Sequence, residues 1–154
     1  MYFEDFEVGA SFVTAGRTIT ESDVMGFAGL SGDMNPLHVD REFARRSEFG
    51  EPVAHGLLVL SIAAGLGIQT GIFSGTNLAL LGLEEWRFLG AVRFGDTIHM
   101  TSTVIETRRT SKGGRGVVRL AQEISNQRDE VVQTGVFASL MAMRTDRSDT
   151  GVSA

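Results

Sequence analysis

Residues 55–70, HGLLVLSIAAGLGIQT, are almost entirely apolar. A helix that is apolar all round is normally buried on every side. Its glycines, Gly56, Gly65 and Gly67, weaken an isolated helix but let another backbone approach closely. The stretch therefore predicts a central helix wrapped by a sheet. Its apolar run is too short to cross a bilayer, which needs about 20 consecutive apolar residues.

The sequence after this helix predicts four strands, at residues 78–88, 97–109, 116–126 and 131–143. In the second of them, apolar and polar residues alternate imperfectly, which is typical of a half-buried strand. Two turns separate the last three strands: the glycine-rich SKGGRG at residues 111–116 and a polar turn at residues 127–130. Together with the central helix, these strands predict a single α+β domain, in which one long helix packs on an antiparallel sheet.

The sequence before the helix predicts a surface segment, a strand, a helix and a shorter helix, at residues 1–9, 11–19, 20–29 and 41–47. Thr20 fits the N-cap of the first of these helices, and Asp23 three residues later resembles a capping box. Residues 31–38 are expected to form a loop, because Gly, Asp and Asn cluster there and Pro36 disfavours helix at Asn35.

The bulk composition narrows the classes of function. A chain of 154 residues suits one domain, which we expect at residues 1–145, followed by a polar tail at residues 146–154. The net charge of -5 argues against a nucleic-acid partner. The absence of cysteine excludes disulfides, thiolate metal sites and cysteine nucleophiles. The acidic, aromatic start MYFEDFEVGA does not resemble a signal peptide, so a cytoplasmic location is expected.

The residues that could carry chemistry are concentrated in FAGLSGDMNPLHVDREF, residues 27–43. Asp33 and His38 are five residues apart in a segment that Pro36 stiffens. A carboxylate beside an imidazole suits general acid–base catalysis, since histidine titrates near neutrality. By residue type alone, a capping Asp and a hydrogen-bonded structural His are the more common interpretation.

The spacing of Asp33, Asn35, Pro36 and His38 resembles a known family motif. The segment GDMNPLH, residues 32–38, is similar to the G-D-x-N-P-x-H signature of the MaoC-like hydratases. The opening FEDFEVGASF, the helix start PVAHGLL at residues 52–58 and FGDTI at residues 94–98 also resemble segments of that family. The similarity covers most of the chain, from about Tyr2 to Arg144.

The resemblance implies a hot-dog fold, in which an antiparallel sheet wraps one long helix, and two chains commonly pair as a homodimer. It implies reversible addition of water to trans-2-enoyl-CoA thioesters, which gives (R)-3-hydroxyacyl-CoA. The reaction needs no metal or redox cofactor, and no membrane partner is expected. Asp33 and His38 would then activate the water and move the proton to C2. The N–H of Gly56 would polarise the thioester carbonyl, a role that also suits the free N–H groups at a helix N-terminus.

Five further residues are candidates for substrate binding: Asn35, Pro36, His55, Lys112 and Arg115. Asn35 either holds the loop or orients the catalytic water, and His55 either contacts substrate or makes a structural contact at the helix start. Lys112 and Arg115 either meet the CoA phosphates or belong to a solvated hairpin.

Two other functions share this fold. One is a hot-dog acyl-CoA thioesterase, and the other is a non-catalytic subunit that binds acyl-CoA or a protein partner. The intact D-x-N-P-x-H segment, residues 33–38, favours the hydratase. Because a fold does not decide function, the choice depends on the site.

Overall fold

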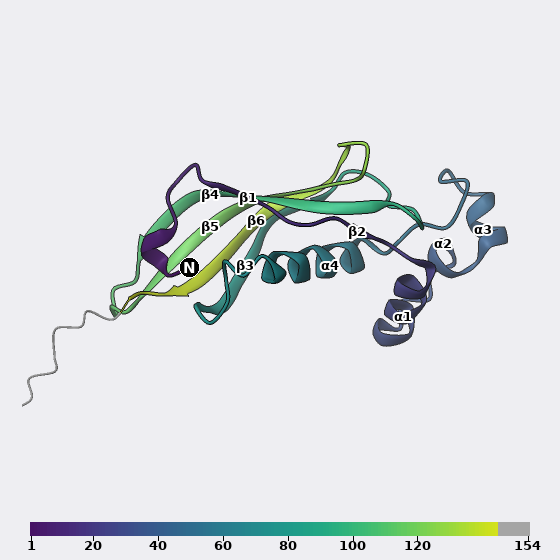
Figure 1. Cartoon of the computed structure of the whole chain (residues 1–154). Coiled ribbons are helices and arrows are strands. Elements are labelled where there is room, and N and C mark those ends of the chain that lie inside the picture. Colours follow the sequence, from purple (N-terminus) through teal and green to yellow (C-terminus); the bar gives the residue numbers. More distant parts are fainter. Residues whose placement is uncertain (145–154) are drawn as a thin grey trace, which may run out of the picture.

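A computed structural model describes residues 1–144. Its six strands form one antiparallel sheet in the order β1–β4–β5–β6–β3, and β2 pairs with β4 off this path. The strands are β1 (Ser11–Val13), β2 (Arg17–Thr18), β3 (Asn77–Phe88), β4 (Thr97–Arg109), β5 (Arg115–Ser125) and β6 (Val131–Ala142). Helix α4 (Gly56–Gln69) lies along one face of this sheet (Figure 1). The arrangement confirms the predicted hot-dog fold.

The shorter helices lie at the two ends of the sheet. Helices α1 (Glu21–Ser31), α2 (Pro36–Val39) and α3 (Arg41–Arg45) gather beyond the N-terminus of α4, whereas the 3-10 helix η1 (Phe3–Asp5) covers the opposite end (Figure 1). The termini of the described chain lie at the η1 end, far from α1, α2 and α3. The predicted tail at residues 146–154 lies outside the described residues.

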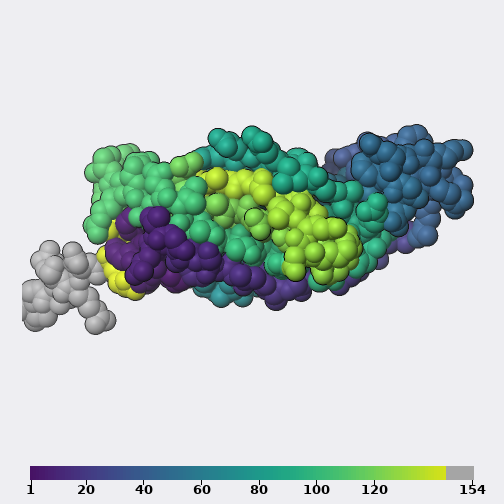
Figure 2. Space-filling view, turned by 90° about the horizontal axis from the view of Figure 1, so that it is seen from above, coloured from purple at the N-terminus to yellow at the C-terminus, as the bar shows by residue number. Residues whose placement is uncertain are grey.

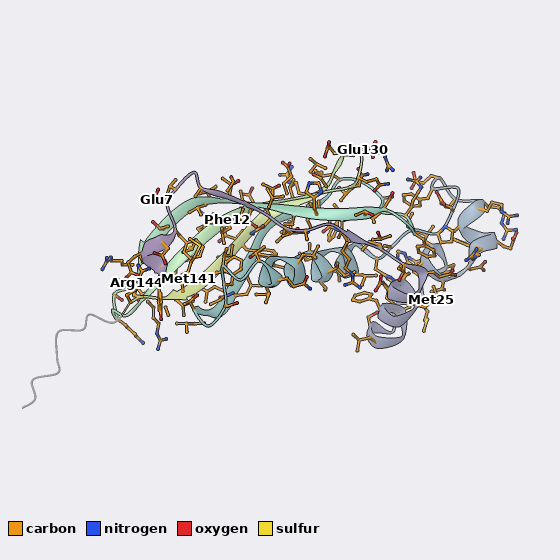
Figure 3. All side chains as sticks on the ribbon, viewed as in Figure 1. Glu7, Phe12, Met25, Glu130, Met141 and Arg144 are labelled. Atoms are coloured by element: carbon orange, nitrogen blue, oxygen red, sulfur yellow. The ribbon has the colours of Figure 1, made fainter. Side chains whose placement is uncertain are left out.

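The core has two parts. In the first, Leu58, Val59, Ile62 and Ala63 of α4 join buried side chains of β4, β5 and β6, which confirms that this helix is the centre of the domain. The second is aromatic and fills the η1 end, with buried side chains Phe3, Phe6, Phe73, Val104, Val118, Leu120 and Met141. Figure 3 shows Phe12 and Met141 at this end and Met25 on α1 at the other. The two ends of the domain thus have different sets of buried side chains.

The four predicted strands after α4 are confirmed to within one residue at each end. The predicted strand at residues 11–19 is wrong in part, because it is broken into β1 and β2. At the break, Thr14 forms both hydrogen bonds to β4. Its backbone N–H donates to Met100 O (3.0 Å), and its hydroxyl accepts from Met100 N (2.9 Å). Gly16 then passes close to Thr97 on β4, where a Cβ would lie 3.2 Å from Thr97 Cγ2.

Helix α1 has the predicted capping box, since Thr20 Oγ1 accepts from Asp23 N (3.2 Å) and Asp23 Oδ2 accepts from Thr20 N (2.9 Å). It runs to Ser31 rather than to Gly29, and Gly32 ends it with a φ of 77°. The predicted loop at residues 31–38 is therefore too long. Its last part is helix α2. Asn35 is the N-cap of this helix and Pro36 is its first residue, and both residue types favour the start of a helix at these positions.

Candidate functional site

The turn between α1 and α2 fixes Asp33. Gly32 adopts the left-handed conformation that ends α1, and Asn35 caps α2 by accepting a hydrogen bond from Leu37 N (3.1 Å). Pro36 is the first residue of α2. The Asp33 carboxylate accepts a hydrogen bond from Asn35 N (3.3 Å) and is otherwise exposed. The structure thus places Asn35 and Pro36 directly beside Asp33, in positions where both shape the turn.

His38 is held in one tautomer. Its ring is half-buried on α2, and Nδ1 lies 2.7 Å from the carbonyl oxygen of Val53. Because a carbonyl oxygen only accepts, Nδ1 carries the hydrogen and donates it, which leaves the lone pair on Nε2. A second contact, from Val53 N to Leu37 O (3.2 Å), ties the same two segments together. His38 is therefore oriented with a free basic nitrogen.

His55 packs behind this pair. It is only 2 % exposed, and its Nε2 donates to the backbone carbonyl of Asp33 (2.9 Å). Its ring lies against His38 with centroids 3.8 Å apart and against Phe27 with centroids 5.0 Å apart. His55 Nδ1 is buried without a hydrogen-bond partner among the described residues. The contact with Asp33 is structural, since it holds the turn that presents the carboxylate.

Asp33, His38 and His55 form one cluster. Each offers one ligand-type atom, and these atoms lie within 4.8 Å of one another. The set could in principle hold a cation, but two of its ring nitrogens already donate to carbonyls. What remains is a carboxylate beside an imidazole lone pair, an arrangement that suits general acid–base chemistry.

Gly56 is the first residue of α4, where an N–H has no carbonyl partner within the helix. Its own carbonyl accepts a hydrogen bond from Gln133 Nε2 (2.9 Å). Gln133 Oε1 in turn accepts from Trp86 Nε1 (3.0 Å), which fixes the amide. Sequence reasoning missed both of these residues, although a glutamine in the apolar strand VVQTGVF, residues 131–137, is a signal that a buried partner exists.

A groove opens beside this helix start. It has a volume of about 460 Å³, and its walls include Leu57 of α4 and Phe88 of β3 as well as Gly56 and Gln133. The ring of Phe88 lies so close to Gly56 that a Cβ there would be 2.6 Å from Phe88 Cδ1. The glycine therefore lets the groove wall approach the helix N-terminus.

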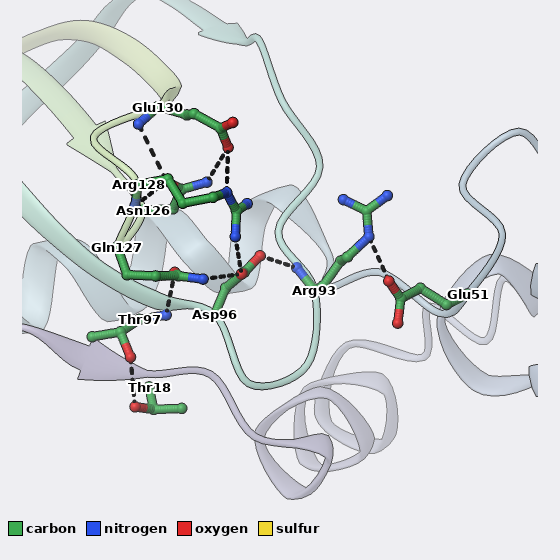
Figure 4. A network of polar contacts seen from close by, with 9 residues as sticks. All are labelled: Thr18, Glu51, Arg93, Asp96, Thr97, Asn126, Gln127, Arg128 and Glu130. Atoms are coloured by element: carbon green, nitrogen blue, oxygen red, sulfur yellow. Dashed lines mark hydrogen bonds and ion pairs between the residues drawn. The ribbon is translucent and has the colours of Figure 1, made fainter.

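A polar network holds the segment that precedes α4 (Figure 4). Arg93 Nε pairs with Glu51 Oε1 (2.6 Å), and Ala54 N donates to Val92 O (2.8 Å). Asp96 accepts hydrogen bonds from Arg93 N (2.8 Å), Gln127 Nε2 (2.7 Å) and Arg128 Nη1 (3.3 Å). The Val53 carbonyl that orients His38 is therefore anchored, through residues 92–96, to the turn between β5 and β6.

Lys112 and Arg115 are not part of this cluster. Lys112 lies in the turn between β4 and β5, and Arg115 is the first residue of β5; both are at the end of the sheet opposite α1, α2 and α3 (Figures 1 and 2). Strand β4 has 13 residues, so its first and last residues are roughly 40 Å apart at about 3.3 Å per residue. Within one chain the structure therefore does not bring Lys112 and Arg115 together with Asp33, and their contact with CoA phosphates stays a prediction.

The comparison with known proteins agrees with this geometry. The model of the MaoC like domain family matches residues 5–126, a range that includes Asp33, His38 and Gly56. The chain belongs to the MaoC-like family. Among the described residues of this MaoC-like chain, no helix is long and apolar enough to pass through a membrane.

Relatives of the MaoC-like chain include named hydratases. It is 42% identical over 114 residues to Protein MaoC of Klebsiella aerogenes, covering 74% of this chain but only 33% of that protein. It is 41% identical over 104 residues to the (R)-specific enoyl-CoA hydratase of Rhodospirillum rubrum, covering 67% of this chain and 69% of the relative.

A solved structure has the same fold throughout. The monoamine oxidase regulatory protein of Archaeoglobus fulgidus superposes with a TM-score of 0.88 at 38% identity, covering 94% of this chain and 96% of that one. Relatives are thus named as enzymes and as a regulatory protein, and the family-level assignment is a hydratase or dehydratase of the MaoC-like type.

Proposed function

We propose that this chain is an (R)-specific enoyl-CoA hydratase that adds water reversibly to trans-2-enoyl-CoA thioesters. The observation that carries the proposal is the position of Asp33 and His38, which form one cluster beside the N-terminus of α4. Similarity to the (R)-specific hydratase of Rhodospirillum rubrum supports the same reaction class.

The proposed reaction uses the pair as a unit. Asp33 and His38 together take a proton from water, whose oxygen bonds to C3 of the enoyl group, and deliver a proton to C2. His38 Nε2 is free to accept a proton because its Nδ1 is committed to Val53 O. The two groups lie in one cluster, so the proposal assigns the proton transfers to the pair rather than to one residue.

The proposed role of Gly56 concerns charge. As water adds at C3, negative charge develops on the thioester oxygen, and a fixed N–H at that point lowers the barrier. Gly56 provides such an N–H at the N-terminus of α4, where the helix dipole also favours negative charge. Gln133 and Trp86 hold this helix start in place.

We also propose that the functional unit is a homodimer paired along β3. This strand is at the edge of the sheet, and large apolar side chains on it and just after it are about half exposed: Leu78, Leu80, Leu81, Leu83, Phe88 and Leu89. An unpaired apolar edge is unstable in water unless it is covered. A second copy at β3 would also wall the groove beside Gly56, which Phe88 and Leu89 line.

The test of the proposed function is incubation with crotonyl-CoA. Loss of the enoyl-thioester absorbance and formation of (R)-3-hydroxybutyryl-CoA are expected. Release of free CoA without hydration would identify a thioesterase instead. Silence with short, long and branched enoyl-CoAs would favour a binding subunit and would overturn the proposal.

A further inference from the structure

His55 is the N-cap residue of α4 and directly precedes Gly56 in the chain. Its backbone carbonyl accepts a hydrogen bond from Val59 N (3.2 Å), as the carbonyl of an N-cap residue does. N-cap residues are usually Ser, Thr, Asp or Asn, whose side chains also accept a hydrogen bond from an N–H group of the first turn. The side chain of His55 makes no such bond. The reason for a histidine at this position therefore lies in the other contacts of its ring.

The ring of His55 contacts both members of the acid–base pair. Its Nε2 donates to the backbone carbonyl of Asp33 (2.9 Å), in the turn that presents the carboxylate. The ring also lies on that of His38, with centroids 3.8 Å apart and an angle of 34° between the planes. Phe27 of α1 packs against the same ring with centroids 5.0 Å apart. His55 therefore connects the start of α4 to Asp33 and to His38.

Burial and hydrogen bonding restrict this ring. His55 is 2 % exposed, and its Nε2 carries a hydrogen because the carbonyl oxygen that it faces only accepts. Its Nδ1 is buried and has no hydrogen-bond partner among the described residues, so a hydrogen placed there would have no acceptor. This hydrogen-bond pattern suits the uncharged tautomer. An uncharged ring adds no repulsion when His38, stacked on it, takes up a proton in the proposed reaction.

The proposed reaction needs its two sets of groups at a fixed separation. Asp33 and His38 act at C2 and C3 of the enoyl group, whereas the N–H of Gly56 acts on the thioester oxygen of the same rigid, conjugated unit. A misplacement of about 1 Å can cost about 100-fold in rate. The connection through His55 is short, because it consists of one peptide bond and one side chain. A second connection, from His38 Nδ1 to Val53 O (2.7 Å), fixes the pair on the same segment that leads into α4.

We propose, on the basis of the hydratase function proposed above, that His55 is a positioning residue that holds the acid–base pair at its working distance from the N–H of Gly56. The hydrogen bond from Nε2 sets the turn of Asp33, and the ring sets the orientation of His38. His55 itself transfers no proton, because its Nε2 is committed to a carbonyl and its Nδ1 is buried. A change at His55 should therefore lower the rate of the bound complex without weakening substrate binding.

Two substitutions separate the contacts of His55. His55→Gln keeps an N–H donor at about the reach of Nε2 but removes the ring, whereas His55→Phe keeps a ring but removes the donor. In the hydration of crotonyl-CoA, each is expected to lower kcat by about 10- to 100-fold, with KM changed by less than about twofold. Binding of butyryl-CoA, the saturated analogue, is expected to stay within about twofold of wild type.

Ile124→Val is the control for a loss of stability alone. Ile124 is fully buried on β5, in the core that contains the buried side chains of α4. Deleting a methylene group there is expected to lower the unfolding temperature and to leave kcat unchanged. Thermal unfolding of every variant shows whether it is folded. If one substitution at His55 prevents folding, the other decides the test.

The outcomes separate this inference from the proposed function. If the wild-type chain hydrates crotonyl-CoA and the folded His55 variants keep its kcat, His55 is only a packing residue and the inference is overturned while the function stands. A rise in KM with kcat unchanged also overturns it, because His55 then contacts the substrate. An equal fall in kcat for Ile124→Val overturns it as well, since loss of stability then explains the effect. If the wild-type chain hydrates no enoyl-CoA, the proposed function itself fails. A fall in kcat at unchanged KM, confined to the His55 variants, supports the inference.

Discussion

The Asp96 carboxylate is almost fully buried and receives hydrogen bonds from three residues, which lie in two segments of the chain. Burial by itself opposes ionisation, yet the pKa of Asp96 is lowered from its ordinary value, because Arg93 N, Gln127 and Arg128 stabilise the charged form. A depressed pKa in the folded state adds stability above the ordinary pKa of about 3.9. That stability is lost as the pH falls through the folded value.

Replacing this carboxylate therefore gives a pH-dependent effect. Asp96→Asn is expected to lower the free energy of unfolding at pH 7 by about 1–3 kcal/mol, the usual range for a buried group that loses charged hydrogen bonds. The difference from wild type should be smaller at pH 3, because the unfolded chain takes up the proton below about pH 3.9, whereas the folded carboxylate, with its lowered pKa, does so only at a lower pH. Urea unfolding at the two pH values measures it. Asp129→Asn, an exposed change in the neighbouring turn, is the control; an equal loss at both pH values for Asp96→Asn would contradict the account.

The catalytic candidates show which residues a sequence can reveal. Asp33 and His38 were predictable because they lie five residues apart in one rigid segment, so local geometry brings them together. His55 is 17 residues beyond His38, and only the tertiary fold stacks the two rings. Lys112 and Arg115 were chosen as candidates only because they are basic. Charge does not show at which end of the 13-residue strand β4 a residue lies.

At the scale of elements, two glycines near the end of α1 offer a matched comparison. Gly29 lies inside the helix with open space at its Cβ position, whereas Gly32 has a φ of 77°. Gly29→Ala is expected to stabilise the chain by about 0.5–1 kcal/mol, because alanine is the better helix former. Gly32→Ala is expected to destabilise by about 1 kcal/mol, because a Cβ strains the left-handed conformation. Thermal unfolding compares them; the same sign for both would be inconsistent with this helix end.

The start of α4 gives a second prediction. Gln133→Leu removes the donor to Gly56 O and leaves the Trp86 N–H unpaired. We expect a loss of about 1–3 kcal/mol in stability. We also expect a fall in kcat of up to about 100-fold with little change in KM, since a small displacement of a positioned donor weakens the transition state most. Gln69→Leu on the exposed end of the same helix is the control. A change in KM alone would exclude this positioning role.

The elements themselves were predictable where one pattern covers a whole segment. The helix at residues 55–70 and the four later strands were predictable because a continuous apolar run marks the helix and polar or glycine-rich turns bound the last three strands. The break between β1 and β2 was not predictable, since it depends on Thr14 meeting Met100, 86 residues away in the chain. Helix α2 was missed because four residues are too few to show a helical period.

For the whole molecule, the exposed edge of β3 determines the expected assembly. Leu81 is 54% exposed on this edge strand, and Val13 is 63% exposed on the opposite edge of the sheet. Light scattering coupled to size-exclusion chromatography is expected to give a dimer for the wild-type chain. Leu81→Lys should shift it toward monomer, because charge on an edge strand opposes pairing, and Val13→Lys should leave the dimer intact. A dimer lost only in Val13→Lys would place the interface elsewhere.

The most direct test of the central claim, that Asp33 and His38 act as one acid–base pair on an enoyl thioester, is the rate of crotonyl-CoA hydration by single and double variants. Asp33→Asn and His38→Gln are each expected to lower kcat by about 10²- to 10⁴-fold. The double variant should be little worse than either, because the two residues act as a unit. Asp40→Asn, which preserves the N-cap of α3, is the matched control and should keep full activity. Near-wild-type hydration in either single variant would contradict the assignment of the pair.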